Sequence, residues 1–412
     1  MGRFVSARWE PDPAALGPRR ARVGGHYRPF IPDPLQGLPV VLPGAVAADV
    51  ADAERAMLEL QSQGSGAGNA HRLEPLARLL LRAEAVASSQ IEGLHVSPRR
   101  LALAEFGVAS AGSDTAHDVV GNIRALSDAL ALGATGAPIT IDALCAIHAT
   151  LMAGTRAEAI GGLLRRTQNW IGGYSPLDAS FVPPPPDNVP ALLEDLCAYA
   201  NGSEHSPLVQ AAVVHAWFET IHPFADGNGR AGRALLHVIL RRRGLCKQFV
   251  PPLSLVLATR SDDYVRGLTG LRLACPPTDP AFTEALASWL EFIAQCTRLA
   301  CTQLANYEAA ISALVESWRA RVLATCGPLR ADAATWVLLT ALPAAPLVTT
   351  QSAVTLTGRS ERAVEAGLAH LLRAGVVKQV GGRVRYRLYE AVGVFDLVAR
   401  PPNRPVPGRP RR

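Results

Sequence analysis

The residues best suited to chemistry in this 412-residue chain stand together at 222–233, His-Pro-Phe-Ala-Asp-Gly-Asn-Gly-Arg-Ala-Gly-Arg. His222 is a candidate base, because imidazole can take up a proton near neutral pH. Asp226 offers the hard oxygen ligands that Mg²⁺ prefers. Gly227 and Gly229 allow a tight turn whose N–H groups point toward an anion. The combination indicates a site that handles the phosphates of a nucleotide.

Two predicted helices must position this loop. Residues 209–221 are apolar and free of Pro and Gly, which predicts a buried helix. Residues 231–243 predict a second helix that ends before Gly244. The loop therefore leads into a helix N-terminus, where free N–H groups and the helix dipole favour anions. Arg230 and Arg233 would be neighbours on that helix.

This segment resembles the signature of the Fic family, H-x-F-x-[D/E]-G-N-G-R-x-x-R, and matches it at every defined position. The alternative is a plain glycine turn between core helices, with His222 as a buried, hydrogen-bonded histidine. A plain turn does not require an aspartate, an asparagine and two arginines at fixed offsets, so the family resemblance is favoured.

The resemblance implies a nucleotidyltransferase that moves AMP from ATP to a Ser, Thr or Tyr hydroxyl of a target protein, with Mg²⁺ as cofactor. His222 would be the general base, and Asp226 would hold the metal. Gly227, Asn228 and Gly229 would surround the phosphates, and Arg233 would clamp the γ-phosphate. The nucleotide-binding set it implies is Phe224, Ala225, Asp226, Gly227, Asn228, Gly229, Arg230, Arg233 and Tyr264.

A second motif lies at residues 84–93, Glu-Ala-Val-Ala-Ser-Ser-Gln-Ile-Glu-Gly. It is similar to the inhibitory motif [S/T]-x-x-x-E-[G/N] of Fic proteins. Ser88 and Glu92 would share one helical face, and Gly93 would stop the helix. The resemblance implies that Glu92 pairs with Arg233 in the space that the γ-phosphate needs. The alternative is a solvated helix end.

A third segment resembles the Fic flap, a short β-hairpin that docks a target protein by strand pairing. It comprises residues 165–173 and 181–186, the latter ending in the proline run Pro183–Pro186. The alternative for the proline run is a polyproline linker or a ligand of an SH3-type domain.

The pattern changes after about residue 325. Residues 348–358 and 359–375 predict two helices joined by a turn, and 376–388 alternate around Gly381-Gly382 as in a β-hairpin. This order resembles a winged helix-turn-helix. DNA is a possible partner, and protein docking or dimerisation is the alternative. The candidate DNA contacts are Arg359, Ser360, Arg362, Arg383, Arg385 and Arg387.

We therefore expect a mainly α fold: a Fic-type helical core with a β-hairpin flap, plus a C-terminal winged helix-turn-helix. Residues 1 to about 45 are rich in Pro, Gly and Arg and predict an extended segment. The expected divisions are an N-terminal region with the inhibitory helix at 1–110, a catalytic core at 111–275, a long helical connector at 276–325, the winged helix at 326–398 and a disordered tail at 399–412.

Composition favours a soluble protein of the cytoplasm. The chain has 7 cysteines, an odd number without a C-x-x-C pair, which indicates thiols in a reducing compartment. No apolar run is long enough to predict a membrane span. The formal charge of +6 is modest for this length and does not by itself indicate nucleic acid.

The leading hypothesis is a self-inhibited protein adenylyltransferase, with a homodimer as the candidate assembly. One alternative is a DNA-binding transcriptional regulator that uses the Fic fold as a nucleotide sensor. His222 disfavours the sensor, because a sensor needs no base. A further alternative is a de-AMPylase, in which the inhibitory glutamate positions a water.

Overall fold

The computed structural model describes the chain apart from residues 11–22, 64–69, 107–113, 248–249, 381–386 and 400–412. Within the described residues the fold is mainly helical, which confirms the expected class. The extended N-terminal segment forms short antiparallel pairs, β1 (Gly2–Phe4) with β4 (Phe30–Pro32) and β2 (Ala7–Trp9) with β3 (Gly25–Tyr27).

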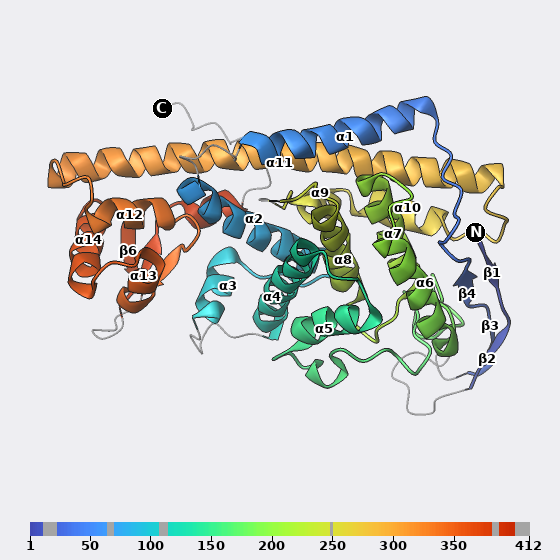
Figure 1. Ribbon diagram of the computed structural model, residues 1–412. Coiled ribbons are helices and arrows are strands. Elements are labelled where there is room, and N and C mark those ends of the chain that lie inside the picture. The colour runs from blue at the N-terminus through green and yellow to red at the C-terminus, as the bar shows by residue number, and fades with distance from the viewer. Residues whose placement is uncertain (11–22, 64–69, 107–113, 248–249, 381–386, 400–412) are drawn as a thin grey trace, which may run out of the picture.

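A long helix, α11 (Pro280–Cys326), runs along one side of the molecule, with α1 (Gly44–Gln63) packed beside it (Figure 1). The helix begins where Asp279 caps it through the Ala281 N–H, and it ends at Gly327 with φ of 72°. A capping carboxylate at one end and a glycine in a positive-φ conformation at the other are ordinary helix boundaries. The first part of α11 joins the main core, and its end carries the C-terminal domain.

At the centre of the main core is α8 (Asn228–Arg242), most of whose residues are buried and which packs against α4, α7, α5 and α2. This helix begins at Asn228 and not at Ala231 as the sequence predicted, because Gly227 takes a left-handed conformation, with φ of 75°, and serves as the N-cap. The other elements of this part of the chain are α2 (Ala70–Ile91), α3 (Pro98–Glu105), α4 (Asp114–Thr135), α5 (Ile141–Met152), η3 (Glu158–Ile160), η4 (Pro186–Asn188), α6 (Val189–Asn201), α7 (Pro207–Ile221), α9 (Leu253–Thr259) and α10 (Ser261–Gly270).

The C-terminal domain, residues 334–399, has its own hydrophobic cluster, to which α11 adds Trp318 and Val322. Its three-stranded sheet has the antiparallel order β5-β7-β6. The expected Gly381-Gly382 turn lies outside the described residues, as do Arg383 and Arg385. The elements are α12 (Ala334–Ala341), β5 (Leu347–Thr349), α13 (Thr350–Thr357), α14 (Glu361–Arg373), β6 (Val377–Val380), β7 (Leu388–Ala391) and α15 (Val394–Ala399).

Local sequence explains the tight helix pair α13–α14. Thr349 and Ser352 form a capping box at the start of α13, and Gly358 ends that helix with φ of 63°. Ser360 then caps α14 by accepting from the Ala363 N–H.

Among the helices of the described ranges, none has the length and apolarity that crossing a membrane requires.

Candidate active site

The loop between α7 and α8 is closed by its own asparagine. The Asn228 Oδ1 accepts from the Phe224 N–H and its Nδ2 donates to the Phe224 carbonyl, both at 2.8 Å. Both polar atoms of the Asn228 amide therefore hold the shape of the loop. Backbone N–H groups at the start of α8 are left to face a ligand.

A buried histidine that the sequence analysis missed supports the same loop. His148 on α5 stacks on Phe224 with ring centroids 3.7 Å apart. Its Nδ1 accepts from the Gly162 N–H, so the proton is on Nε2, which donates to the Asp226 carbonyl at 3.0 Å. Burial lowers the pKa of His148, which keeps this neutral tautomer. Nothing in the sequence near His148 signals this contact.

His222 stands at the end of α7 in a left-handed conformation, with φ of 51°. Its carbonyl accepts from the Arg165 Nε at 2.8 Å, which fixes this uncommon conformation from outside the loop. The imidazole keeps 19% of its surface exposed. Burial, aided by the charges of Arg272 and Arg165, lowers the pKa of His222 to about 4. The ring is therefore neutral at pH 7 and able to accept a proton.

The residues expected to form a flap lie against this histidine. Ile171 and Phe181 form an antiparallel bridge, with the Ile171 N–H donating to the Phe181 carbonyl at 2.9 Å. Arg165 donates to the Pro184 carbonyl at 2.5 Å as well as to His222. Asn169 donates to the Phe224 carbonyl at 3.1 Å. The hairpin and the loop are thus one hydrogen-bonded unit.

The first turn of α8 has room for an anion. A Cβ added to Gly229 would lie 2.0 Å from the Glu92 Oε1 and 3.0 Å from the Arg233 Nη1. Only glycine therefore leaves space for an oxygen here. Arg230 is buried, yet its Nε and Nη1 lack hydrogen-bond partners among the described residues. Buried donors without partners are costly, so these N–H groups are candidates to bind an anion.

Glu92 already places a carboxylate in that space. Its Oε1 accepts from the Arg233 Nη2 at 2.8 Å, and the Glu92 side chain is 37% exposed. Arg233 also donates to the Ser88 hydroxyl at 2.9 Å and to the Ser88 carbonyl at 2.7 Å. Gly93 follows directly with φ of 77° and ends the turn. The three residues of the expected inhibitory motif and Arg233 are brought together.

Buried polar contacts hold α2 in this position. Glu84 accepts from the His237 Nε2 at 2.8 Å and from the Ser254 N–H at 2.7 Å. Asn122 on α4 donates to the Ala85 carbonyl at 2.7 Å. Because the partners come from α8, α9 and α4, the helix that carries Glu92 is anchored on three sides.

Glu219 is a further site residue that sequence reasoning did not find. Its Oε2 lies 4.0 Å from the His222 Nδ1, and its Oε1 has no hydrogen-bond partner in the described part of the chain. Burial raises the pKa of Glu219 to about 7. The charge next to His222 therefore changes near neutral pH. Its place one helical turn before His222 was the signal available in the sequence.

Asp226, the expected metal ligand, is exposed, whereas Tyr264, the expected nucleoside contact, is buried. The side chain of Asp226 is 62% exposed, and its Oδ1 accepts from the Gly227 N–H at 2.6 Å. The described residues contain no cluster of three or more His, Cys, Asp or Glu placed to hold a metal. Tyr264 is buried, with its hydroxyl hydrogen bonded to His215 at 2.7 Å, and so lies in the core. Ala225 is exposed on the loop.

Comparison with known proteins places this region in context. The family model described as Fic/DOC family matches residues 138–240, and the one described as Fic/DOC family N-terminal matches residues 47–131. The first covers the flap, the loop and most of α8, and the second covers α2 and most of α1 and α4.

Curated relatives match over the same region. Protein adenylyltransferase fic-1 of Caenorhabditis elegans is 31% identical over 129 residues, 31% of this chain and 23% of the relative. Protein adenylyltransferase Fic of Drosophila melanogaster is 34% identical over 117 residues, 27% of this chain and 22% of the relative. The probable protein adenylyltransferase aq_aa38 of Aquifex aeolicus is 44% identical over 68 residues, 16% of this chain and 21% of the relative. The matched part is thus less than a quarter of each relative's length.

Solved structures show the same fold. A Fic family protein from Desulfovibrio desulfuricans G20 has a TM-score of 0.50 at 20% identity, covering 86% of this chain and 98% of that one. Fic-1 from C. elegans has a TM-score of 0.50 at 21% identity, covering 65% of this chain and 74% of that one.

Proposed function

Because the chain carries a Fic/DOC family domain and the N-terminal segment of that family, we propose that it is a protein adenylyltransferase. It moves AMP from ATP to a Ser, Thr or Tyr hydroxyl of a target protein. The observation that carries the proposal is a partly buried, neutral imidazole beside a glycine cradle with a buried, unsatisfied arginine. The names of the curated relatives agree with this activity.

In this proposal His222 removes the proton from the incoming hydroxyl as the oxygen attacks the α-phosphorus. Pyrophosphate leaves on the opposite side, and the proton remains on the imidazole. Positioning and charge stabilisation supply most of the rate in such transfers. The Arg165 and Asn169 contacts hold the His222 backbone while this occurs.

The phosphates would be held by the first turn of α8 and its arginines. Arg230 offers the orphaned Nε and Nη1, and Arg233 offers the guanidinium that Glu92 now occupies. Asp226 is the residue that would hold Mg²⁺, since Mg²⁺ usually takes one or two carboxylates together with substrate phosphates. Bound there, the metal would neutralise phosphate charge during transfer.

Glu92 would inhibit the enzyme by competing with the γ-phosphate for Arg233. The two charged groups are 2.8 Å apart. A Cβ on Gly229 would lie 2.0 Å from the Glu92 Oε1, so the carboxylate lies in the space beside Gly229 that a phosphate oxygen would need. Phosphate and carboxylate cannot both occupy that space. ATP would still bind, but its α-phosphorus would be held away from the line of attack.

The target would dock along the flap by backbone pairing with the strand around Ile171. The hydrogen bonds between flap and loop would place its hydroxyl close to His222. We place the activity in the cytoplasm, in keeping with the free thiols of all 7 cysteines.

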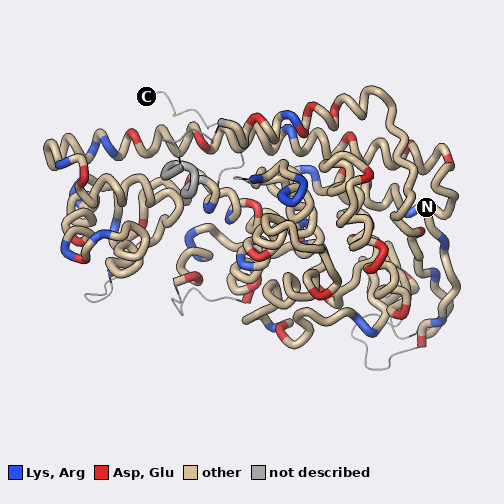
Figure 2. Tube along the Cα trace, in the orientation of Figure 1, with Lys and Arg blue, Asp and Glu red and all other residues tan. Residues whose placement is uncertain are grey.

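The order of helices and strands in the C-terminal domain supports a winged helix. Acidic and basic positions are mixed along α14, where Glu361 and Glu365 stand among Arg362 and Arg373 (Figure 2). DNA binding favours a face of one positive sign. We therefore propose that the domain contacts protein or small ligands in preference to DNA.

Self-labelling with α-labelled ATP tests the proposal. The wild-type protein should label weakly, and His222→Ala should not label. A binding assay separates catalysis from nucleotide affinity, because His222→Ala should bind ATP as the wild type does. Equal labelling of wild type and His222→Ala would rule out His222 as the base. ATP binding without transfer in the Glu92→Gly variant would favour the hypothesis that the protein is a nucleotide sensor.

A further inference from the structure

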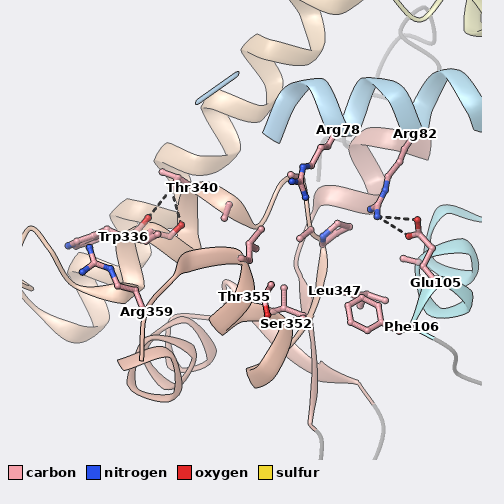
Figure 3. Close-up of a pocket in the computed structure, with 18 residues that line it drawn as sticks. Arg78, Arg82, Glu105, Phe106, Trp336, Thr340, Leu347, Ser352, Thr355 and Arg359 are labelled. Atoms are coloured by element: carbon pink, nitrogen blue, oxygen red, sulfur yellow. Dashed lines mark hydrogen bonds and ion pairs between the residues drawn. The ribbon is translucent and has the colours of Figure 1, made fainter. Parts of the chain in front are cut away.

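A cavity lies between α2–α3 and the C-terminal domain. Its volume is about 1010 Å³, and no residue of the 222–233 loop lines it. One wall comes from α2 and the end of α3, and the other from α12, β5 and α13 (Figure 3). The cavity thus adjoins the helix that ends in Glu92, at a distance from the catalytic loop.

The lining combines cationic edges with an apolar middle. In Figure 3, Arg78 and Arg82 approach from α2, and Arg359 approaches beside Trp336 from the opposite side. Arg82 pairs with Glu105 at 3.0 Å. Arg82 is neutralised by Glu105, and Arg359 adds a further positive charge to the lining. The apolar middle is formed by Ala341, Ala344, Ala345, Pro346, Leu347 and Leu356.

Aromatic surface is also available at this cavity. Phe106 is 39% exposed although it is a large apolar side chain. Trp336 is partly buried, and the Arg319 guanidinium lies over its ring, 5.3 Å from the ring centroid. Small-molecule sites typically combine apolar and aromatic walls with a few charged groups that fix orientation. Guanidinium groups select carboxylates, sulfonates and phosphates.

We propose that this cavity binds an amphipathic organic anion, with an apolar or aromatic body and one acid group, and that the bound anion strengthens inhibition by Glu92. The first part stands on the lining alone. The second part rests on the adenylyltransferase function proposed above.

The coupling follows from the position of α2. Arg82 and Glu92 belong to the same helix and the turn that ends it, about 15 Å apart along the axis at 1.5 Å per residue. The neighbouring α3 is tied to the C-terminal domain, because Arg99 pairs with Glu390 at 2.7 Å. Lys378 pairs with the same buried carboxylate at 2.7 Å. Movement of α2 therefore changes both the cavity and the Glu92–Arg233 contact.

The direction of the effect follows from linkage. The cavity has its present shape while Glu92 is bonded to Arg233. A ligand that fits this shape binds the inhibited arrangement more tightly than an arrangement with α2 displaced, and so favours inhibition.

Binding is tested with 8-anilinonaphthalene-1-sulfonate and its uncharged counterpart N-phenyl-1-naphthylamine. Arg359→Ala should weaken binding of the sulfonate about three- to tenfold, as expected for one charge-assisted contact. It should leave binding of the neutral dye unchanged. Arg330→Ala is the matched control, since Arg330 is an exposed arginine near the same domain that does not line the cavity. Equal sulfonate affinity in Arg359→Ala and the wild type would overturn the site.

Displacement identifies the acid group. 1-Naphthoate and 1-naphthyl phosphate share the ring and differ in the anion, so the stronger competitor names the preferred class. Failure of both to displace the sulfonate would overturn the proposed ligand chemistry.

Self-labelling with ATP tests the coupling. Saturating sulfonate should lower labelling of the wild type and leave Glu92→Gly unchanged, because that variant lacks the inhibitory carboxylate. Unchanged wild-type labelling, or an equal loss in both proteins, would refute the coupling. If neither protein labels, the adenylyltransferase proposal fails, while the dye measurements still decide the binding site.

Discussion

Replacement of Glu92 by glycine should raise the rate of AMP transfer about five- to twelvefold. The change removes the carboxylate that accepts from Arg233 at 2.8 Å. A hydrogen bond between charged groups contributes about 1.5–3 kcal/mol, and the 37% exposure of Glu92 reduces this to about 1–1.5 kcal/mol. Since about 1.36 kcal/mol corresponds to a factor of ten, that range gives the expected increase.

The assay is the initial rate of self-labelling with α-labelled ATP at saturating nucleotide. Glu92→Gln is the matched variant, because it keeps the length of the side chain and removes the charge. Its rate should lie between those of the wild type and Glu92→Gly. Rates equal to the wild type in both variants would refute the idea that Glu92 occupies the phosphate position.

Gly229→Ala separates loss of the glutamate contact from opening of the cradle. The added Cβ would lie 2.0 Å from the present Glu92 Oε1, so the carboxylate must move. The same Cβ fills the space proposed for a phosphate oxygen. Gly229→Ala alone should therefore label no faster than the wild type, and it should cancel the gain of Glu92→Gly in the double variant. Activation by Gly229→Ala would contradict the overlap of carboxylate and phosphate.

Other substitutions test the remaining parts of the site. In the Glu92→Gly background the rate should rise with pH as Glu219 ionises, because ionised Glu219 next to His222 strengthens the base. Since burial and, to a lesser extent, the charge of Glu92 raise the pKa of Glu219 to about 7, this rise should lie below pH 7 in the variant. Glu219→Gln should flatten this profile, and a retained inflection would exclude Glu219. Asn228→Ala removes both hydrogen bonds to Phe224 and should lower the free energy of unfolding by about 1–3 kcal/mol, measured by urea denaturation. His148→Phe keeps the stacking on Phe224 and leaves the Gly162 N–H and the Asp226 carbonyl without their partner, so labelling and the thermal midpoint should both fall. Because burial keeps His222 neutral, the unfolded chain takes up a proton at this residue between about pH 6.5 and 4 while the folded chain does not, so the free energy of unfolding decreases as the pH is lowered through that range. His222→Gln should make this decrease shallower by up to about 1 kcal/mol per pH unit. Glu219 acts in the opposite sense between about pH 4.5 and 7, because its pKa is raised in the folded chain.

Much of the site could be predicted from sequence because its residues are close along the chain. The loop 222–233 joins two helices whose apolar patterns are plain, so its place between them followed from local rules. The pairing of Glu92 with Arg233 joins residues far apart in sequence, and only the family resemblance suggested it before the structure showed the contact.

Other features depended on contacts that no local pattern encodes. The sequence determined that glycines, a histidine and two arginines lie in one loop and the first turns of the helix that follows it. Tertiary packing decided that Asn228 closes the loop and that His148 supports it from α5. It also placed Tyr264 in the core, because its hydroxyl finds His215 there. Local rules describe neighbours along the chain, whereas burial, pKa shifts and orphaned donors arise only when distant helices exclude water together.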